Sequence, residues 1–176
     1  MIRTKPGPDK ASGPSYITAE GFHTLKAELK YLWKEKRPEV TQAVREAAAQ
    51  GDRSENAEYI YGKKQLREID RRIRFLTKRT EALTVVDRLP DDQTRAFFGA
   101  WVTVEEVSPE GAAQEHCYRI VGSDEFDLCR GYLSINSPMA RALLGKRVDD
   151  EVIVRTPTGS REWTIIEIRY PALVGE

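Results

Sequence analysis

The strongest constraint on the fold is an unbroken apolar seam in the second quarter of the chain. Its positions alternate steps of three and four residues, at Tyr59, Gly62, Leu66, Ile69, Ile73, Leu76, Thr80 and Leu83. This heptad spacing is typical of a coiled-coil helix, which buries one narrow face against a partner helix. The fold therefore needs a second long helix to cover the seam.

An earlier apolar stripe predicts that second helix. Thr18 can cap its start, and its apolar positions are Phe22, Leu25, Leu29, Leu32, Val40, Ala43 and Ala47. Gly51 is a typical stop after the last turn. The two stripes cover each other most simply in an antiparallel coiled-coil hairpin over residues 16–83, with its turn at residues 51–56. Helices of about 30 residues, at about 1.5 Å per residue, give a rod roughly 45 Å long.

Pro38 interrupts the first stripe, which also slips near Lys36. A proline inside a helix removes one backbone hydrogen bond and crowds the preceding turn. The stripe can continue as one bent helix or as two helices in series. We expect a bend in the turn before Pro38, because the periodicity resumes at once.

From Thr84 onward the spacing becomes typical of strands. Five runs rich in β-branched and aromatic residues predict strands at 101–106, 116–122, 132–135, 151–155 and 162–170. A short helix is expected from Ser137 to Leu144, with Pro138 at its first position. Residues 84–176 therefore predict an α+β domain. Residues 1–15 are rich in Pro, Gly and Lys and predict a flexible tail.

Composition argues against several classes of protein. The 28 basic and 28 acidic residues cancel, so the overall charge does not indicate a nucleic-acid binder. No run of about 20 apolar residues is present, so a membrane span is not expected. Two cysteines and two histidines give little support to a zinc site, a disulfide framework or a catalytic histidine. This cysteine usage fits a reducing cytoplasm.

The turn of the hairpin contains two acids three residues apart, Asp52 and Glu55. One interpretation is structural: Asp52 is a helix cap and Glu55 completes a capping box. The other is functional: two carboxylates at the end of a rod hold a divalent cation such as Mg²⁺, or orient a water molecule. Because two carboxylates seldom bind Mg²⁺ tightly, another molecule would have to complete such a site.

A basic stripe follows the turn. Between residues 63 and 80 the sequence has eight basic and two acidic residues, a local surplus of six. We define the basic stripe as Lys63, Lys64, Arg67, Arg71, Arg74 and Lys78. Most of its members are three or four residues apart and therefore share one helical face. Such a face can follow a phosphate backbone, with Tyr59, Tyr61 or Phe75 available for stacking, or it can be a solvated flank of the coiled coil.

Three segments of the sequence resemble the Gre family of bacterial transcription factors. They are Gly51-Asp52-Arg53-Ser54-Glu55-Asn56-Ala57-Glu58-Tyr59, Leu66-Arg67-Glu68-Ile69-Asp70-Arg71-Arg72-Ile73 and Ser137-Pro138-Met139-Ala140-Arg141-Ala142-Leu143-Leu144-Gly145-Lys146. The dense basic run and Arg53 favour the GreB branch of that family over the GreA branch. The likeness extends from Tyr16 to Tyr170.

The resemblance implies a fold and a mechanism. The coiled-coil hairpin would be joined to a C-terminal domain similar to the FK506-binding fold, which docks on RNA polymerase through Asn136, Ser137 and Pro138. The hairpin would enter the secondary channel of the polymerase, where Asp52 and Glu55 share Mg²⁺ with it and help it to cleave backtracked RNA. The basic stripe would guide the RNA 3′ segment.

The resemblance also implies that the chain is not itself an enzyme, and that it is a cytoplasmic monomer that takes part in DNA binding. Asn136 stands where the GreB branch commonly has Asp, which keeps a capping side chain but loses a charge. Two other functions compete with cleavage. One is a regulator that occupies the channel without promoting hydrolysis, and the other is a prolyl isomerase or chaperone, suggested only by the C-terminal fold.

Overall fold

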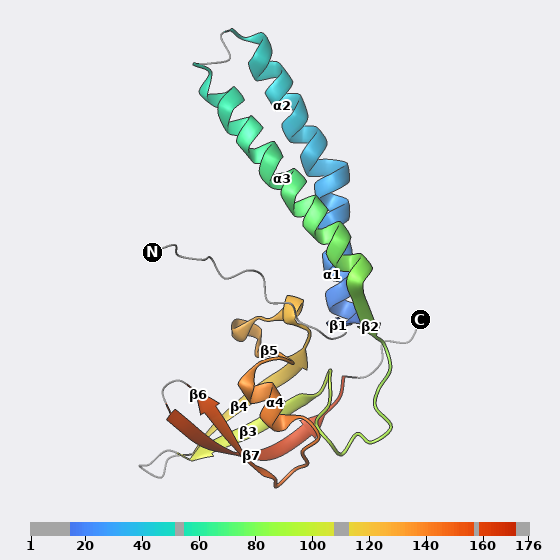
Figure 1. The fold of residues 1–176 in the computed structure, drawn as a ribbon, viewed down its shortest axis with the longest axis vertical. Coiled ribbons are helices and arrows are strands. Elements are labelled where there is room, and N and C mark those ends of the chain that lie inside the picture. Colours follow the sequence, from blue (N-terminus) through green and yellow to red (C-terminus); the bar gives the residue numbers. More distant parts are fainter. Residues whose placement is uncertain (1–14, 52–54, 108–112, 157–158, 172–176) are drawn as a thin grey trace, which may run out of the picture.

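The structure is a computed structural model, and it describes residues 15–51, 55–107, 113–156 and 159–171. Figure 1 shows a long helical hairpin standing on a domain built around a sheet. The helical elements are α1 (Ala19–Tyr31), a π-helical segment (Leu32–Lys36), α2 (Arg37–Ala49) and α3 (Ala57–Ala82). We call this hairpin the rod. The predicted tail lies outside the described residues, except that Ser15 begins a strand.

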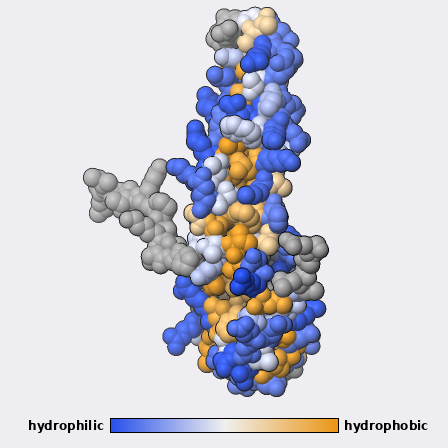
Figure 2. All heavy atoms as spheres, turned by 90° about the vertical axis from the view of Figure 1, so that its right-hand side faces the viewer, coloured by the Kyte–Doolittle hydropathy of each residue, from blue (hydrophilic) through white to orange (hydrophobic). Residues whose placement is uncertain are grey.

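The seam between the helices confirms most of the predicted apolar positions. Helix α2 buries Val40, Val44 and Ala47, and α3 buries Gly62, Ile69, Ile73 and Leu76. The assignment of Ala43 to the seam is wrong, because Ala43 is exposed and Val44 takes that position. Gly62 allows close contact, since a Cβ there would lie 2.5 Å from Cγ2 of Val44. Figure 2 shows the seam as a narrow apolar band between hydrophilic flanks.

The irregular step before Pro38 is a π-helical segment. The backbone N–H of Arg37 donates to the carbonyl of Leu32, five residues earlier. A proline ring would crowd the carbonyl four residues before it in a regular α-helix, and the wider turn relieves that crowding. The predicted bend therefore takes the form of one extra residue in a turn, and the helix continues through Pro38.

A two-stranded parallel sheet closes the base of the rod, and the sequence patterns did not predict it. It pairs β1 (Ser15–Thr18) with β2 (Leu83–Val86), in register from Ser15 opposite Leu83 to Thr18 opposite Val86. The side chain of Ile17 is fully buried there. The strands lead into α1 and out of α3, so they hold both ends of the hairpin together.

The C-terminal domain confirms the predicted α+β character. Its sheet has the order β5-β4-β3-β7-β6, in which only the β4–β5 pair is parallel. Its strands are β3 (Trp101–Val107), β4 (Ala113–Val121), β5 (Tyr132–Ser134), β6 (Glu151–Thr156) and β7 (Gly159–Arg169). Two 3-10 helices, η2 (Ser123–Glu125) and η3 (Leu128–Arg130), connect β4 to β5.

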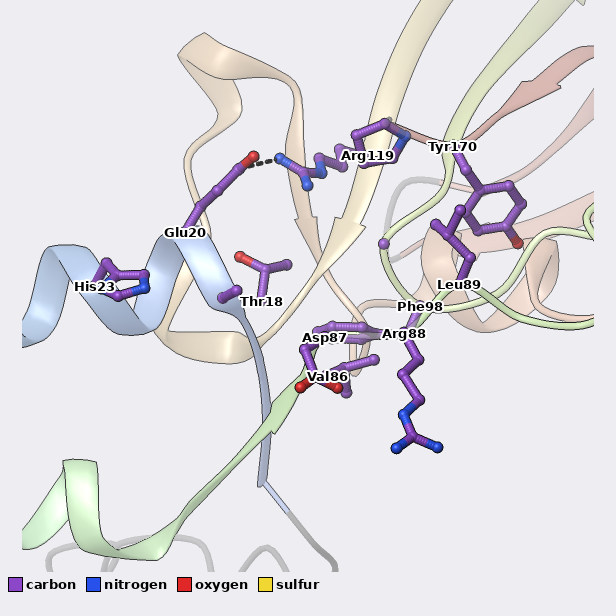
Figure 3. A pocket seen from close by; sticks show the side chains of 13 residues that line it. Thr18, Glu20, His23, Val86, Asp87, Arg88, Leu89, Phe98, Arg119 and Tyr170 are labelled. Carbon is purple, nitrogen blue, oxygen red and sulfur yellow. Dashed lines mark hydrogen bonds and ion pairs between the residues drawn. The ribbon is translucent and has the colours of Figure 1, made fainter. Parts of the chain in front are cut away.

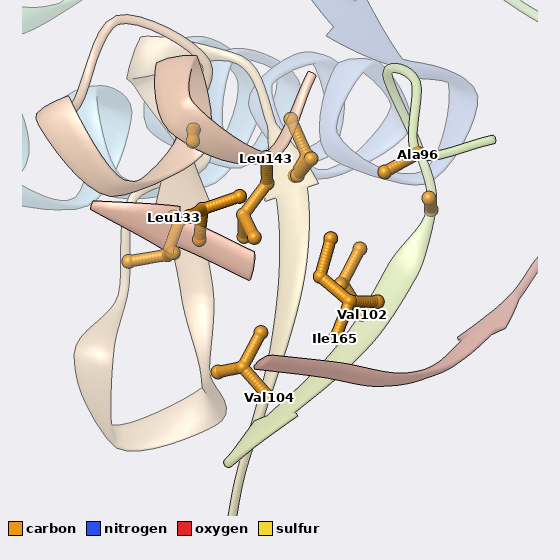
Figure 4. Packing of buried hydrophobic residues seen from close by; sticks show 10 residues of the cluster. Ala96, Val102, Val104, Leu133, Leu143 and Ile165 are labelled. Carbon is orange, nitrogen blue, oxygen red and sulfur yellow. The ribbon is translucent and has the colours of Figure 1, made fainter. Parts of the chain in front are cut away.

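The core of this domain lies between the sheet and α4 (Pro138–Leu143). Figure 4 shows its buried side chains converging from the strands, the helix and the segment before β3, with Ala96, Val102, Val104, Leu133, Leu143 and Ile165 labelled. Burial of this apolar surface is the main contribution to the stability of the domain. Among the described residues, no helix is both long and apolar enough to cross a membrane.

Candidate functional site

The turn of the rod, residues 51–56, is called the tip. Asp52, Arg53 and Ser54 lie outside the described residues, so the structure gives no position for the Asp52 carboxylate. Glu55 is described, is exposed, and lies two residues before the start of α3. Gly51 has a φ of 144°, a conformation that favours glycine directly after α2.

Asn56 fixes the start of α3 beside the tip. Its Oδ1 accepts a hydrogen bond from the backbone N–H of Tyr59 at 3.0 Å, and its Nδ2 donates to the carbonyl of Ala47 at 2.8 Å. One amide therefore caps α3 and ties it to the last turn of α2. The capping-box interpretation of Asp52 and Glu55 is wrong, because the cap is Asn56 and the helix begins at Ala57. The sequence carried this signal, since Asn is a preferred helix cap.

All six members of the basic stripe are exposed on α3. None of them makes an ion pair with another described residue. Arg72 differs, because it donates to both carboxylate oxygens of Glu28 at 2.7 and 2.8 Å. This hydrogen bonding to Glu28 raises the pKa of Arg72. The basic stripe therefore keeps its charge uncompensated within the described part of the chain.

The residues predicted to dock on the polymerase lie at the start of α4, where Asn136 and Ser137 precede the helix and Pro138 is its first residue. We call Asn136, Ser137 and Pro138 the docking loop. Ser137 is the cap of α4, and its hydroxyl accepts from the N–H of Ala140 at 3.1 Å. The capping ability assigned to Asn136 is therefore not used. Its Nδ2 donates instead to the hydroxyl of Ser123 at 3.0 Å. Asn136 and Pro138 are both exposed.

The predicted site residues that the structure describes do not form one cluster. In Figure 1 the end of α2 and the start of α3, which flank the tip, are at the end of the rod farthest from the C-terminal domain. The docking loop belongs to that domain, and the basic stripe lies on α3. No group of three or more His, Cys, Asp or Glu side chains among the described residues could hold a metal ion. The described site residues are therefore spread along the length of the molecule.

A cavity of about 420 Å³ lies at the base of the rod, where no site residue was predicted. Figure 3 shows it between the first turn of α1, the segment after β2 and the C-terminal domain. The buried guanidinium of Arg119 lies beside it and forms an ion pair with Glu20 at 2.6 Å. Sequence reasoning missed this pair because its two residues are 99 positions apart.

Comparison with known proteins covers both parts of the molecule. Residues 15–85 match the family "Transcription elongation factor, N-terminal" of GreA and GreB. Residues 91–170 match the family "Transcription elongation factor, GreA/GreB, C-term". A crystal structure of GreA factor homolog 1 of Thermus thermophilus shares 23% identity over 89% of this chain and 99% of that chain, with a TM-score of 0.41.

Individual relatives are similar over nearly their whole length. Transcription elongation factor GreB of Yersinia pestis is 60% identical over 156 residues, which cover 89% of both chains. Transcription elongation factor GreB of Pseudomonas aeruginosa is 58% identical over 164 residues, which cover 93% of this chain and 95% of that protein. This chain therefore belongs to the GreA/GreB family of transcription elongation factors.

Proposed function

We propose that this chain is a transcript-cleavage factor, which stimulates bacterial RNA polymerase to hydrolyse the 3′ end of backtracked nascent RNA so that elongation resumes. The tip enters the secondary channel of the polymerase and donates Asp52 and Glu55 to its active site. The observation that supports this most is the place of Glu55, an exposed carboxylate beside the fixed start of α3 at the far end of the rod. The chain itself is not an enzyme in this proposal.

Mg²⁺ is the cofactor of this proposal, shared with the polymerase. Carboxylate oxygens are ligands that Mg²⁺ prefers, and Glu55 makes no hydrogen bond or ion pair with another described residue. Asp52 would coordinate the cation, and Glu55 would position the cation or the attacking water. Once bound, Mg²⁺ supplies activation of water or stabilisation of the leaving oxygen in phosphodiester hydrolysis. Ligands from the polymerase must complete the site.

The basic stripe gives the rod a second role, in contacting RNA. Its exposed cations have no acidic partner among the described residues, so a phosphate backbone can neutralise them without breaking an ion pair. Tyr61 and Phe75 lie exposed on the same helix, at 68% and 49%, and can stack on bases. The stripe would then guide the RNA 3′ segment toward the tip.

The docking loop would hold the C-terminal domain at the rim of the secondary channel. Exposed Asn136 and Pro138 offer polar and apolar contact there. We further propose that the factor acts as a monomer in the cytoplasm, and that any association with DNA comes through the transcription complex. The likeness of the C-terminal domain to the FK506-binding fold stays a prediction, and fold alone gives no support to prolyl isomerase activity.

Backtracked elongation complexes with labelled RNA and Mg²⁺ test this proposal. The wild-type chain should shorten the RNA from its 3′ end. Asp52→Asn should lower the stimulated rate on the order of 100-fold, the scale for losing a group that stabilises a transition state. Glu81→Gln removes an exposed acid at the opposite end of α3 and should cleave like wild type.

Equal cleavage by Asp52→Asn and the wild type would refute the assignment of the tip. Tight binding of the wild-type chain to polymerase without any cleavage would favour the channel-occupying regulator instead. The two results are distinguished by measuring binding and RNA length in the same samples.

A further inference from the structure

The base of the rod is attached to the C-terminal domain through carboxylates that no part of the proposed cleavage chemistry uses. Two of them, Asp124 and Glu125, are consecutive residues in η2, and we call them the junction carboxylates. A third, Glu20 in α1, pairs with buried Arg119 of β4, as drawn in Figure 3. Glu125 binds Thr18, the cap of α1, and Asp124 binds Arg79 of α3.

Glu125 holds the start of α1. Its Oε2 accepts from the backbone N–H of Thr18 and from that of Gly122, both at 3.0 Å, and its Oε1 accepts from the Thr18 hydroxyl. The same hydroxyl accepts from the N–H of Gly21 at 3.0 Å, as the cap of α1. Because that hydroxyl has one proton, the proton points to Glu125. The residue that caps α1 is therefore held by the C-terminal domain.

Asp124 holds the last turn of α3. Its two oxygens accept from Nε of Arg79 at 2.9 Å and from Nη2 at 2.8 Å. These side chains are only 28% and 14% exposed, and the hydrogen bonding raises the pKa of Arg79. A two-point contact between planar groups fixes direction as well as distance. The end of α3 is thereby fixed in orientation against η2.

Two glycines permit this close approach. A Cβ at Gly21 would overlap the carboxylate of Glu125, and a Cβ at Gly122 would overlap the backbone carbonyl of Tyr16. The contact at Gly122 is with backbone and could be relieved only by moving β1 relative to η2, whereas a Cβ at Gly21 would displace the side chain of Glu125. The junction is therefore built at backbone contact distance.

Hydrogen bonds connect the docking loop to Ser123, the first residue of η2. Ser123, which precedes Asp124, accepts from Nδ2 of Asn136 at 3.0 Å, and its hydroxyl lies 3.1 Å from that of Ser134. The backbone N–H of Asn136 donates to the same Ser134 hydroxyl at 3.2 Å. The docking loop is thus hydrogen-bonded to Ser123, the residue of η2 that directly precedes the junction carboxylates.

We propose that Asp124 and Glu125 are positioning residues, each holding one helix of the rod, so that docking of the C-terminal domain sets the direction in which the tip points. Neither residue touches RNA or the reacting atoms in this proposal. Its consequence for cleavage rests on the proposed function, whereas its consequence for the shape of the free protein does not.

The shape of the free protein tests the first consequence. Spin labels would be attached at Ala43→Cys on α2 and Ile153→Cys on β6, which are both exposed sites. Cys117→Ser and Cys129→Ser would remove the two native thiols so that only these sites are labelled. With the wild-type junction, the distance between the two labels should have one narrow distribution. Asp124→Ala with Glu125→Ala should broaden it at least twofold, while Glu162→Gln, an exposed acid of β7, should leave it narrow. An unchanged distribution in the double variant overturns the proposal.

Cleavage kinetics test the second consequence with milder variants that keep side-chain size. Asp124→Asn and Glu125→Gln should lower the rate at saturating factor about five- to tenfold, the scale of one or two lost hydrogen bonds. The half-saturating concentration should stay within about twofold, because the docking loop is retained. Asp124→Arg and Arg79→Glu together exchange the charges of the pair. The double variant should have a higher saturating cleavage rate than either single variant.

Two results would separate the possible failures. A weaker affinity with an unchanged saturating rate would overturn the positioning role. Absence of cleavage by the wild-type chain would refute the proposed function, and the distance measurement would still decide whether the junction carboxylates orient the rod.

Discussion

The two ends of the rod use their charges in opposite ways. At the base, Asp124, Glu125 and Glu20 all bond to groups on the other side of the junction. Glu55 beside the tip and the basic stripe along α3 are exposed and make no ion pair with another described residue. Charges at the junction therefore hold the fold together, whereas these charges of the rod remain available to a partner.

Apolar burial follows the same division. In the described part of the rod and its base strands, the large side chains that are fully buried, Ile17 and Leu76, lie near the C-terminal domain. Closer to the tip the seam residue Val44 keeps 9% of its surface exposed. A two-helix rod has no third layer to cover its seam, so seam side chains farther from the base, such as Ile73, Ile69 and Val44, keep more of their surface exposed than Leu76 does. The difference predicts where substitutions should cost stability.

Leu76→Ala should give the largest effect on stability. Removing a fully buried leucine side chain leaves a cavity and typically costs about 3 kcal/mol. Phe75→Ala removes a larger side chain from the adjacent, half-exposed position and should cost less than about 1 kcal/mol. Urea unfolding of both variants compares them directly. Equal losses of unfolding free energy in the two variants would contradict the division between the buried seam and the exposed face of α3.

Asn56→Ala should give an intermediate effect, confined to the tip. The change removes the cap of α3 and the hydrogen bond to Ala47, for which a loss of about 1 kcal/mol is typical. Hydrogen exchange should accelerate in the first turn of α3 and stay unchanged near Leu76. Acceleration along the whole helix would show that the tip and the base are one cooperative unit.

Local patterns explain which parts of the fold could be predicted. The seam of α3 was predicted from Tyr59 to Thr80 because its period is a property of adjacent turns, whereas Leu83, the last predicted position, lies in β2. The register of α2 was predicted less well, and Ala43 was chosen over Val44, because a π-helical segment shifts the period in a way that spacing alone does not show. Asn56 has a residue type that favours helix caps, but the acids on either side of it offer competing caps to a reading of spacing alone.

Contacts between distant segments explain the rest. The β1–β2 pair joins segments of four residues each, too short for a periodic signal. Glu125 and Thr18 are 107 positions apart, and Asp124 and Arg79 are 45 apart. Each of these residues is ordinary in its own neighbourhood, so only the three-dimensional arrangement reveals the junction. The tip acids remain a prediction from resemblance, since Asp52 lies outside the described residues.

Substitutions in the basic stripe should have the smallest effect on stability, and they test most directly whether its charges can bind RNA. Arg67→Gln with Arg71→Gln should change unfolding free energy by less than about 0.5 kcal/mol, because both side chains are exposed and unpaired among the described residues. Salt dependence can be expressed as the slope of the logarithm of the cleavage rate on long RNA extrusions against the logarithm of the salt concentration. If the stripe contacts phosphates of single-stranded RNA, the same change should make this slope shallower by about 1.4, or about 0.7 per charge.

Arg72→Gln is the matched control for that experiment, because Arg72 adjoins Arg71 in the sequence but is already paired with Glu28. Its loss should cost a little stability and leave the salt dependence nearly unchanged, since a paired cation releases fewer counterions when RNA binds. Equal salt slopes for the double variant, Arg72→Gln and wild type would make the stripe a solvated flank of the coiled coil. The free charges of the rod would then serve its solubility rather than its partner.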